Sequence, residues 1–469
     1  MEIYTKSDLD ILDNNINQIE DQVKKRRLEL FEPNNKQVKK IINIIETFLR
    51  KTKRKVYGGH ALNKIVAHRN KDDCLYSQYD LPDIDFYSPS PLDDFFELCN
   101  QFHEAGFKTS GSEAQHEGTY SIFVMYVNFV DITYVPTNIY HRIPFEEKGG
   151  IRYTGIRWMM IDFFRQFADP LNSYFRLQKA FKRFPLLQKY APIKKNPQQI
   201  QIDFPDSVKP VLTTFEKEVI TKDGVIMVGL SAYQKMAEFT KTSTKHLKLG
   251  LDQLPYYELM LPEYENTGKK IINIIQKAHP DLANKVTVVE YTPYFQFLGD
   301  NAIIYVNQVP VARIFSNNGQ CIPVHRIKRD GGEIKLGSYS IQMLYSMSMM
   351  MKGRTDKKKD MTNVYSMLVS HLIELKREYF KRSKKDIMDE TPFAEFIVDC
   401  IGTTVPPEIA KQLRIEENKR KNKPYRFTYR PADKLMEPGK ISFRYPNTSG
   451  NPIKNVKYMV FQKELALAN

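Results

Sequence analysis

Two short stretches decide how this sequence folds: VYGGHALNKI at residues 56–65 and LPDIDFYSP at residues 81–89. The first predicts a short strand, a tight turn and then a helix, because paired glycines let the backbone turn sharply. The second predicts a strand in which Asp83 and Asp85 project together, since side chains two positions apart in a strand share a face. The apolar residues between and after these aspartates can anchor the other face of the strand in a core.

The paired carboxylates point to a cation site. Two carboxylates held this close repel each other unless a cation lies between them. A third acid, Asp131, stands between apolar residues in the stretch FVDIT at residues 129–133, which also predicts a strand. If the two strands are neighbours, Asp83, Asp85 and Asp131 meet at one place and can hold two divalent ions, Mg²⁺ or Mn²⁺. Such a site supports in-line attack of a hydroxyl on a phosphate.

The glycine turn supplies the other half of the predicted site. Gly58 and Gly59 let backbone amides approach a phosphate at the positively polarised start of a helix. Lys64 lies one turn into that helix, and Arg152 and Lys179 are weaker candidates for binding a triphosphate. Taken alone, a Gly-Gly pair is more often an ordinary turn, and an Asp-x-Asp pair is more often a solvated edge. The combination of all three motifs favours catalysis.

The sequence contains a second, altered copy of the same module. Four segments recur in the same order, displaced by 171, 173, 179 and 182 residues: 56–65 with 227–236, 81–89 with 254–262, 126–135 with 305–314, and 149–155 with 331–337. In this alignment the three acidic positions become Tyr256, Glu258 and Pro310. A change at every candidate catalytic position predicts a duplicate without activity. Lys64 is matched by Lys235, which allows a structural role for that lysine.

Composition limits the class of protein. The 469 residues are 42% hydrophobic and carry a net charge of +15, so we expect a globular protein with a polyanionic partner, most simply nucleic acid. No run of about 18 apolar residues occurs, and the first ten residues are polar, which excludes a membrane span and a secretory signal. Four cysteines lie far apart, in neither a disulfide framework nor a zinc pattern, and favour a reducing, cytoplasmic compartment.

Helices are predicted before the first module and toward both of its ends. Amphipathic packing helices are expected over 7–30 and 36–51, and the segment from 149 to 190 is also helical. That segment carries an aromatic stripe that we interpret as core: Tyr174, Phe175, Phe181 and Phe184. The basic residues between these aromatics suit a triphosphate, RNA or a solvated helix face: Arg176, Lys179, Lys182 and Arg183.

The C-terminal segment is basic. Residues 411–440 hold ten basic and four acidic residues, and aromatic and basic residues alternate near position 427. Arginine and tyrosine together can grip an RNA backbone and stack on bases. The candidates for RNA contact are Lys421, Tyr425, Arg426, Tyr429 and Arg430. We therefore expect four parts: an N-terminal helical extension (1–35), a catalytic module (36–200), a degenerate module (201–400) and a basic C-terminal segment (401–469).

The succession of the glycine pair, the Asp-x-Asp strand and the third aspartate resembles the polymerase-β-like nucleotidyltransferase superfamily. The interval from residue 59 to residue 83 requires a loop insertion at about 67–80. With its basic composition, helical N-terminus and degenerate second module, the chain resembles the poxvirus-type poly(A) polymerase catalytic subunit and its giant-virus relatives. This resemblance implies an α+β fold with two nucleotidyltransferase-like modules, of which only the first is catalytic.

The resemblance also implies roles for individual residues. Asp83 and Asp85 would bind both metal ions, and Asp131 would complete the site nearest the RNA 3′-hydroxyl. Gly58, Gly59 and His60 would contact the phosphates of ATP. From the residues alone, His60 is interpreted as a polar group at the helix start and not as a general base.

The implied enzyme is a polynucleotide adenylyltransferase that adds AMP from ATP to the 3′ end of single-stranded RNA without a template. Its cofactors would be two Mg²⁺ or Mn²⁺ ions, and its location the host cytoplasm or the virion of a virus. The duplicated modules and the N-terminal helices offer surface for a homodimer. Two alternatives are another nucleotidyltransferase of this fold, such as a CCA-adding or oligoadenylate-forming enzyme, and a non-catalytic RNA-binding scaffold.

Overall fold

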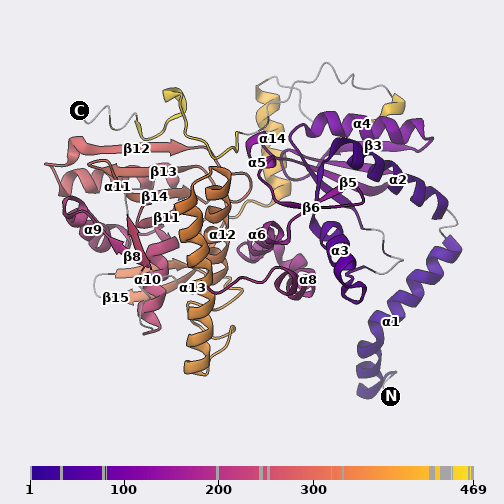
Figure 1. Cartoon of the computed structure of the whole chain (residues 1–469), viewed down its shortest axis with the longest axis horizontal. Coiled ribbons are helices and arrows are strands. Elements are labelled where there is room, and N and C mark those ends of the chain that lie inside the picture. The colour runs from indigo at the N-terminus through magenta and orange to yellow at the C-terminus, as the bar shows by residue number, and fades with distance from the viewer. Residues whose placement is uncertain are drawn as a thin grey trace. The chain divides into compact units, whose positions relative to one another are not determined.

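A computed structural model describes the chain in two compact units (Figure 1). Unit 1 comprises residues 1–134, 144–155 and 422–444, and unit 2 comprises residues 135–143, 156–421 and 445–469. The structure describes residues 3–31, 35–76, 80, 82–196, 200–241, 247–250, 254–317, 319–329, 332–421, 428–433, 445, 447–462 and 465. The boundaries at residues 35, 200 and 400 stay predictions.

Unit 1 is a mixed sheet with helices. Its helices are α1 (Lys6–Phe31), α2 (Asn35–Thr52), α3 (Gly58–Arg69) and α4 (Pro91–Glu104). Its strands are β1 (Lys55–Tyr57), β2 (Ile84–Ser88), β3 (Thr109–Glu113), β4 (Thr119–Val124), β5 (Val127–Tyr134), β6 (Phe145–Lys148), β7 (Ile151–Thr154) and β18 (Thr428–Tyr429). The strand order is β18-β3-β4-β5-β2-β1-β7-β6. Only β2 with β5 and β1 with β7 pair in parallel, so the described sheet is mostly antiparallel.

The core of unit 1 lies between this sheet and helices α2 and α4. The apolar stripe of α2 is buried, and the ring of Phe48 lies 5.9 Å from the ring of Phe86 on β2. On α4, Phe95 and Phe102 are fully buried. Alternation along β2 turns Phe86 into this core and Asp85 toward the opposite face of the sheet. The hydrophobic packing of one face therefore fixes the direction in which the carboxylate points.

Unit 2 contains the remaining elements. Its helices are α5 (Thr137–Tyr140), α6 (Ile156–Phe167), α7 (Pro170–Ser173), α8 (Leu177–Tyr190), α9 (Lys209–Thr214), α10 (Gly229–Phe239), α11 (Tyr264–Ala278), α12 (Tyr339–Thr355), α13 (Lys359–Ser383) and α14 (Pro407–Arg420). Its strands are β8 (Ile200–Asp203), β9 (Ile226–Val228), β10 (Leu247–Gly250), β11 (Tyr257–Leu261), β12 (Val286–Tyr291), β13 (Asn301–Val306), β14 (Val309–Ser316), β15 (Ile322–Arg329), β16 (Gly332–Gly337) and β17 (Cys400–Ile401).

The large sheet of unit 2 repeats the topology of unit 1. Its order is β12-β13-β14-β11-β9-β16-β15-β17. From β12 to β15 every strand has a counterpart between β3 and β6, and β11 with β14 and β9 with β16 form the parallel pairs. In both units a helix begins at a glycine directly after the central strand, at Gly58 and at Gly229. The α+β class and the duplicated module are thereby confirmed.

Strand register corrects one part of the sequence alignment. In unit 1 Asp85 pairs with Asp131, and in unit 2 Glu258 pairs with Arg313. The two hairpins β4–β5 and β13–β14 also correspond turn to turn, with Val124 opposite Val127 and Val306 opposite Val309. The counterpart of Asp131 is therefore Arg313, not Pro310. Matching the letters YVN aligned a strand end with a turn, because the sequence alone does not reveal where the hairpin turns.

Three further expectations are wrong in the structure. The segment 149–190 was expected to be helical, but its first residues form strand β7. Helix α1 spans the predicted segment, but its apolar ridge is exposed by 38–60% and does not pack as predicted: Leu9, Leu12, Ile16, Ile19 and Val23. The cysteines do include a bonded pair, because Cys321 and Cys400 form a disulfide across a separation of 79 residues. Pairing of β15 with β17 brings these distant residues together. Among the described helices, none combines the length and the apolar character that crossing a membrane requires.

Candidate active site

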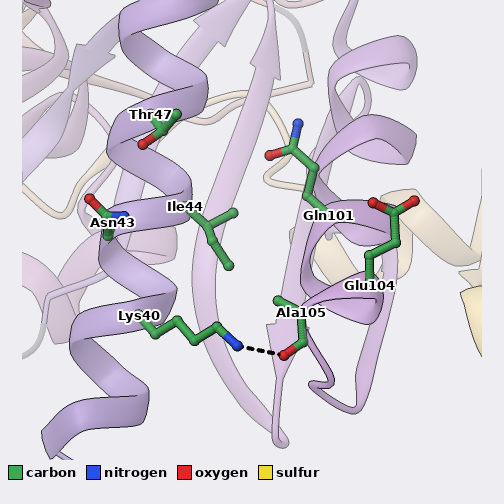
Figure 2. A pocket seen from close by; sticks show the side chains of 7 residues that line it. All are labelled: Lys40, Asn43, Ile44, Thr47, Gln101, Glu104 and Ala105. Atoms are coloured by element: carbon green, nitrogen blue, oxygen red, sulfur yellow. Dashed lines mark hydrogen bonds between the residues drawn. The ribbon is translucent and has the colours of Figure 1, made fainter.

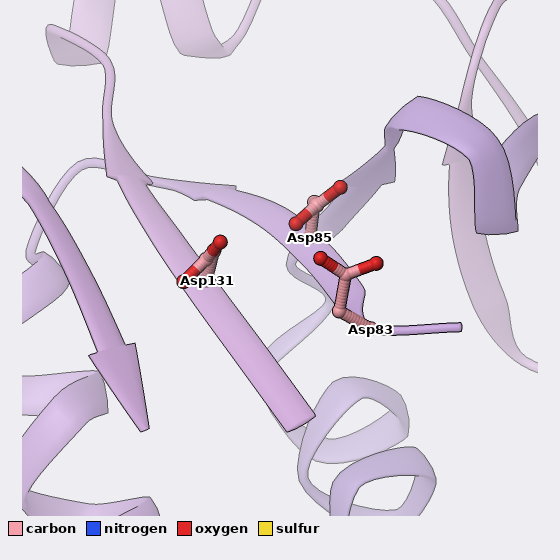
Figure 3. Close-up of side chains that lie close together, drawn as sticks. All are labelled: Asp83, Asp85 and Asp131. Carbon is pink, nitrogen blue, oxygen red and sulfur yellow. The ribbon is translucent and has the colours of Figure 1, made fainter. Parts of the chain in front are cut away.

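Three carboxylates come together on one face of the unit 1 sheet, at its central strands β2 and β5 (Figure 3). Asp83 precedes β2, Asp85 lies on β2 and Asp131 lies on β5. Each offers a carboxylate oxygen, and these oxygens all lie within 4.8 Å of one another. Asp83 is exposed, whereas Asp85 and Asp131 are partly buried. An all-oxygen donor set of this size fits a hard divalent cation.

Asp131 is held in place by its neighbours on the sheet. The hydroxyl of Ser121 donates a hydrogen bond to Oδ1 of Asp131 at 2.5 Å, and the amide of Asn128 donates to the same atom at 3.2 Å. Ser121 lies directly opposite Asp131 on β4. Neither donor was predicted from the sequence, although Thr119 and Ser121 alternate with the apolar Tyr120 and Ile122 in β4, which was a usable signal for Ser121.

The glycine turn lies against the same carboxylates. Gly58 has a φ of +73°, and a Cβ atom at this position would lie 2.7 Å from Oδ2 of Asp85. Helix α3 begins there, and its N-cap residue Tyr57 makes no side-chain capping bond. The first amides of α3 are therefore left to other acceptors, as phosphate binding at a helix start requires. Gly59 is buried on the same turn.

His60 follows the two glycines on α3. Burial disfavours the imidazolium form, and the nearby charge of Lys64 adds to this effect, so the pKa of His60 falls to about 4. The imidazole is therefore neutral near pH 7. A neutral ring can donate a hydrogen bond to a phosphate but adds no positive charge.

A further polar layer covers the sheet face that carries Asp85. The rings of Tyr57 and Tyr87 stack at 4.0 Å, and the hydroxyl of Tyr57 lies 2.9 Å from the hydroxyl of Thr133. Burial and the negative charge of Asp85 raise the pKa of Tyr57 well above its usual value. The phenol therefore stays neutral, and its ring packs beside the carboxylates.

Lys55 on β1 belongs to this face, and sequence reasoning missed it. It is only 2% exposed, and its Nζ lies 5.0 Å from the centre of the Phe145 ring. Burial, with repulsion from Arg152, lowers the pKa of Lys55 to about 8. Its position two residues before Tyr57 in a strand was the available signal.

The other predicted phosphate contacts have partners of their own. Lys64 is exposed on α3 and lies 3.9 Å from Glu46 of α2. Arg152 on β7 pairs with Glu147 at 3.3 Å and lies over the Phe145 ring. Lys179 is exposed on α8 of unit 2. The triphosphate roles of these residues stay predictions.

The predicted RNA-binding residues fall in different parts of the fold. Tyr425 and Arg426 lie outside the described residues. Lys421 directly follows α14 as its C-cap residue and pairs with Glu417, whereas Arg430 is exposed after β18. Tyr429 is 6% exposed, and its hydroxyl donates to Oδ1 of Asn100 at 2.6 Å. This packing favours a structural role for the Tyr429 ring, and RNA contact by the others stays a prediction.

The corresponding place in unit 2 is filled by a buried polar cluster. Glu258 is fully buried and accepts hydrogen bonds from the hydroxyls of Tyr345 and Tyr365 and, at 3.2 Å, from the amide of Leu230. Burial raises the pKa of Glu258, while these donors and the charge of Arg313 oppose that rise. A carboxylate enclosed in this way cannot accept a metal ion and a nucleotide together.

A shallow cavity of about 340 Å³ lies between α2 and α4 (Figure 2). Its lining residues are Lys40, Asn43, Ile44, Thr47, Gln101, Glu104 and Ala105. The ammonium of Lys40 donates to the carbonyl of Ala105 at 2.8 Å. Because α2 packs on the Phe86 face of the sheet and Asp85 points to the other face, this cavity is not part of the carboxylate site.

Comparisons with known proteins agree with this fold. Residues 43–173 match the family model "Poly(A) polymerase catalytic subunit", and residues 188–463 match the model of the "Putative poly(A) polymerase, catalytic subunit, C-terminal". A putative poly(A) polymerase catalytic subunit of Acanthamoeba polyphaga mimivirus is 31% identical over 98% of this chain and 84% of its own length. One from African swine fever virus (isolate Pig/Kenya/KEN-50/1950) is 27% identical over 54% of this chain and 52% of its own length.

A solved structure matches almost the whole chain. The crystal structure of the Megavirus polyadenylate synthase has a TM-score of 0.87 and 31% identity, and the match covers 98% of this chain and 94% of that chain. The duplicated sheets and the carboxylate cluster, with this match, define the chain as a nucleotidyltransferase. The chain belongs to the poly(A) polymerase catalytic subunit family. The resemblance stated from the sequence is thereby confirmed.

Proposed function

We propose that this chain transfers AMP from ATP to the 3′ end of single-stranded RNA, without a template, using two divalent ions. The observation that carries the proposal is the convergence of Asp83, Asp85 and Asp131 within 4.8 Å on unit 1, beside a glycine turn that starts a helix. The family and the Megavirus enzyme support a polyadenylating activity. We place the enzyme in the host cytoplasm or the virion, as a homodimer or a monomer.

The reaction balances as one displacement at phosphorus. The 3′-oxygen of the RNA bonds to the α-phosphorus of ATP, the bond from that phosphorus to the bridging oxygen breaks, and pyrophosphate leaves. Asp83, Asp85 and Asp131 would hold Mg²⁺ or Mn²⁺, which when bound neutralises charge on the phosphates and favours deprotonation of the attacking hydroxyl.

The residues of the chain position the reactants around this centre. Ser121 and Asn128 orient the carboxylate of Asp131, on the side we assign to the RNA 3′-hydroxyl. The turn at Gly58 and Gly59 brings the first amides of α3 toward the ATP phosphates, and neutral His60 can donate one further hydrogen bond. Strict spacing of these groups matters because misplacement by about 1 Å can cost roughly 100-fold in rate.

The test is incubation of the protein with a short RNA, Mg²⁺ and each nucleoside triphosphate in turn. Extension with ATP alone supports the proposal, whereas efficient extension with CTP as well favours a CCA-adding enzyme. Asp85→Asn should reduce tailing at least about 100-fold, because even residues behind a metal ligand contribute 10- to 100-fold. Asp93→Asn, which changes an exposed aspartate on α4, is the matched control. Tailing that survives Asp85→Asn and Asp83→Asn would favour the non-catalytic scaffold.

A further inference from the structure

Helix α8 and the turn before it carry a basic surface that the proposed active site does not use. Between residues 170 and 196 the sequence has seven basic and no acidic residues: Arg176, Lys179, Lys182, Arg183, Lys189, Lys194 and Lys195. No other partner class fits such a one-signed surface as well as a polyanion does.

The apolar side of α8 packs within unit 2, with Ala180 and Leu187 buried. Its rings meet those of α6, which lies beside it (Figure 1): Phe184 stacks on Phe163 at 4.5 Å, and Phe181 stacks on Phe167 at 4.9 Å. At the helical repeat, Lys179 and Lys182 fall on the opposite side, where both are exposed. The basic face of α8 therefore points away from its packing partner.

Two aromatic rings stand exposed at the start of this basic face, in the turn Tyr174–Arg176. Tyr174 is 71% exposed and Phe175 is 64% exposed. Their rings lie 5.7 Å apart, edge to face, and the guanidinium of Arg176 lies 5.3 Å from the Phe175 ring centre. The sequence-based interpretation of these two rings as core is wrong. Phe181 is also 44% exposed and Phe184 is partly buried, although both rings contact α6. Large rings left in solvent beside basic groups are typical of stacking platforms for bases.

We propose that Tyr174, Phe175, Arg176 and Lys182, here called the α8 surface, bind single-stranded RNA, with unpaired bases stacked on the two rings and phosphates along the basic face. The inference rests on the proposed function only for the identity of the nucleic acid. Stacking needs a free base face, so the surface selects single strands over duplexes, with little preference for sequence.

The first test measures RNA binding without ATP, by fluorescence anisotropy of a labelled single-stranded 20-nucleotide RNA. The double variant Tyr174→Ala/Phe175→Ala should bind at least about 30-fold more weakly, since two stacked bases are lost and each contributes about 1–3 kcal/mol. Tyr458→Ala removes another exposed tyrosine of unit 2, 67% exposed beside Lys457, and should bind like the parent. If the double variant and the parent bind RNA with equal affinity, the inference is wrong. The exposed rings would then be assigned to contact with a protein partner.

A second measurement keeps the inference testable if the double variant folds poorly. The single native tryptophan, Trp158, is 1% exposed, so Phe175→Trp adds one solvent-exposed indole. Single-stranded RNA should quench this new emission strongly, and duplex RNA of equal charge should quench it less. No quenching at saturating RNA contradicts stacking. Lys182→Ala should lower the slope of log affinity against log salt by about 0.7, and an unchanged slope contradicts phosphate contact.

These outcomes separate the inference from the proposed function. If the chain binds RNA through the α8 surface but extends no RNA with any nucleotide, only the proposed function fails. If the double variant binds and extends RNA like the parent, only the inference fails. Asp85→Asn tests both proposals in one protein. It should abolish extension and retain both the affinity for RNA and the quenching of the Phe175→Trp indole.

Discussion

Gly58 has a φ of +73° and lies next to the carboxylate of Asp85. Because glycine has no side chain, it can adopt this turn conformation and also leave room for that carboxylate. A Cβ atom there would lie 2.7 Å from Oδ2 of Asp85, closer than van der Waals contact allows. Glycine is the residue that tolerates this backbone at no steric cost. The chemistry assigned to Asp85 therefore depends on a neighbour with no functional group.

Gly58→Ala should lower the free energy of unfolding by about 1–2 kcal/mol and reduce tailing by about 10-fold or more, because Asp85 must move. Gly149→Ala is the matched control: Gly149 has a φ of +56°, but a Cβ atom there would have no heavy atom within 4 Å. It should cost similar stability and leave tailing intact. Urea unfolding and initial tailing rates measure the two effects, and equal losses of activity in both variants contradict this account.

His60 makes stability depend on pH at a single residue. Its pKa is lowered to about 4 in the folded chain, from the ordinary value of 6.5, so the unfolded chain binds more protons between these values. Stability is therefore complete above pH 6.5 and falls as the pH drops toward 4. His60→Gln should remove about 2 kcal/mol of the loss in unfolding free energy between pH 7 and pH 5. His68→Gln, at an exposed position of α3, should not alter that loss.

At the scale of elements, pairing between β15 and β17 allows two cysteines to form a disulfide bond. Cys321 and Cys400 are 79 residues apart in the sequence, yet this pairing places them within bonding distance. The spacing rules that identify disulfide frameworks and zinc motifs apply to local patterns, so they are silent about such a pair. The expectation of unpaired cysteines was therefore overturned by topology.

Cys321→Ser should lower the free energy of unfolding by about 2–4 kcal/mol under oxidising conditions, because the cross-link restricts the unfolded chain. A reductant should destabilise the parent to a similar extent and have no further effect on the variant. Cys74→Ser changes an exposed free cysteine and provides the control. Thermal melting with and without reductant measures the difference. A parent whose melting temperature ignores the reductant would argue against the bond.

At the scale of the whole molecule, two sheets of one topology carry opposite electrostatics. In unit 1 the paired positions on adjacent parallel strands are Asp85 and Asp131, which repel each other. In unit 2 they are Glu258 and Arg313, which attract each other. The carboxylates of unit 1 therefore need a cation to neutralise them. In unit 2 the charge of Glu258 is neutralised within the protein by Arg313.

Glu258→Gln should lower the free energy of unfolding by about 2–4 kcal/mol, because it leaves the buried charge of Arg313 without its counterpart. Asp85→Asn should leave stability unchanged or raise it, because it relieves repulsion between carboxylates. The two variants should therefore have opposite effects. Asp85→Asn should abolish tailing without loss of stability. Glu258→Gln should lower stability but retain tailing at temperatures where the protein stays folded. Urea unfolding and tailing at about 25 °C compare them, and a stability loss that is larger for Asp85→Asn refutes the assignment.

Local patterns were sufficient for much of this fold. Helix α2, the strand of Asp85 and the glycine turn are visible in apolar periodicity and in residues with narrow conformational roles. Local patterns did not predict the exposure of the apolar ridge of α1 or of the rings of Tyr174 and Phe175. Periodicity tells which side of a helix is apolar but not whether another element covers it. Ser121 and Lys55 were missed because strand alternation shows which residues share a face but not that the carboxylates lie on the same face.

By itself the sequence determined which residues could do chemistry, because the Asp-x-Asp strand, the glycine pair and the altered repeat are written in local order. Only the tertiary structure decided which of them meet. Parallel pairing of β2 with β5 sets Asp85 beside Asp131, and the hairpin register sets Arg313, not Pro310, in the corresponding place of unit 2. The physical reason is that a one-residue shift in a strand reverses the face on which every side chain lies, and hydrogen bonding between distant strands selects the shift.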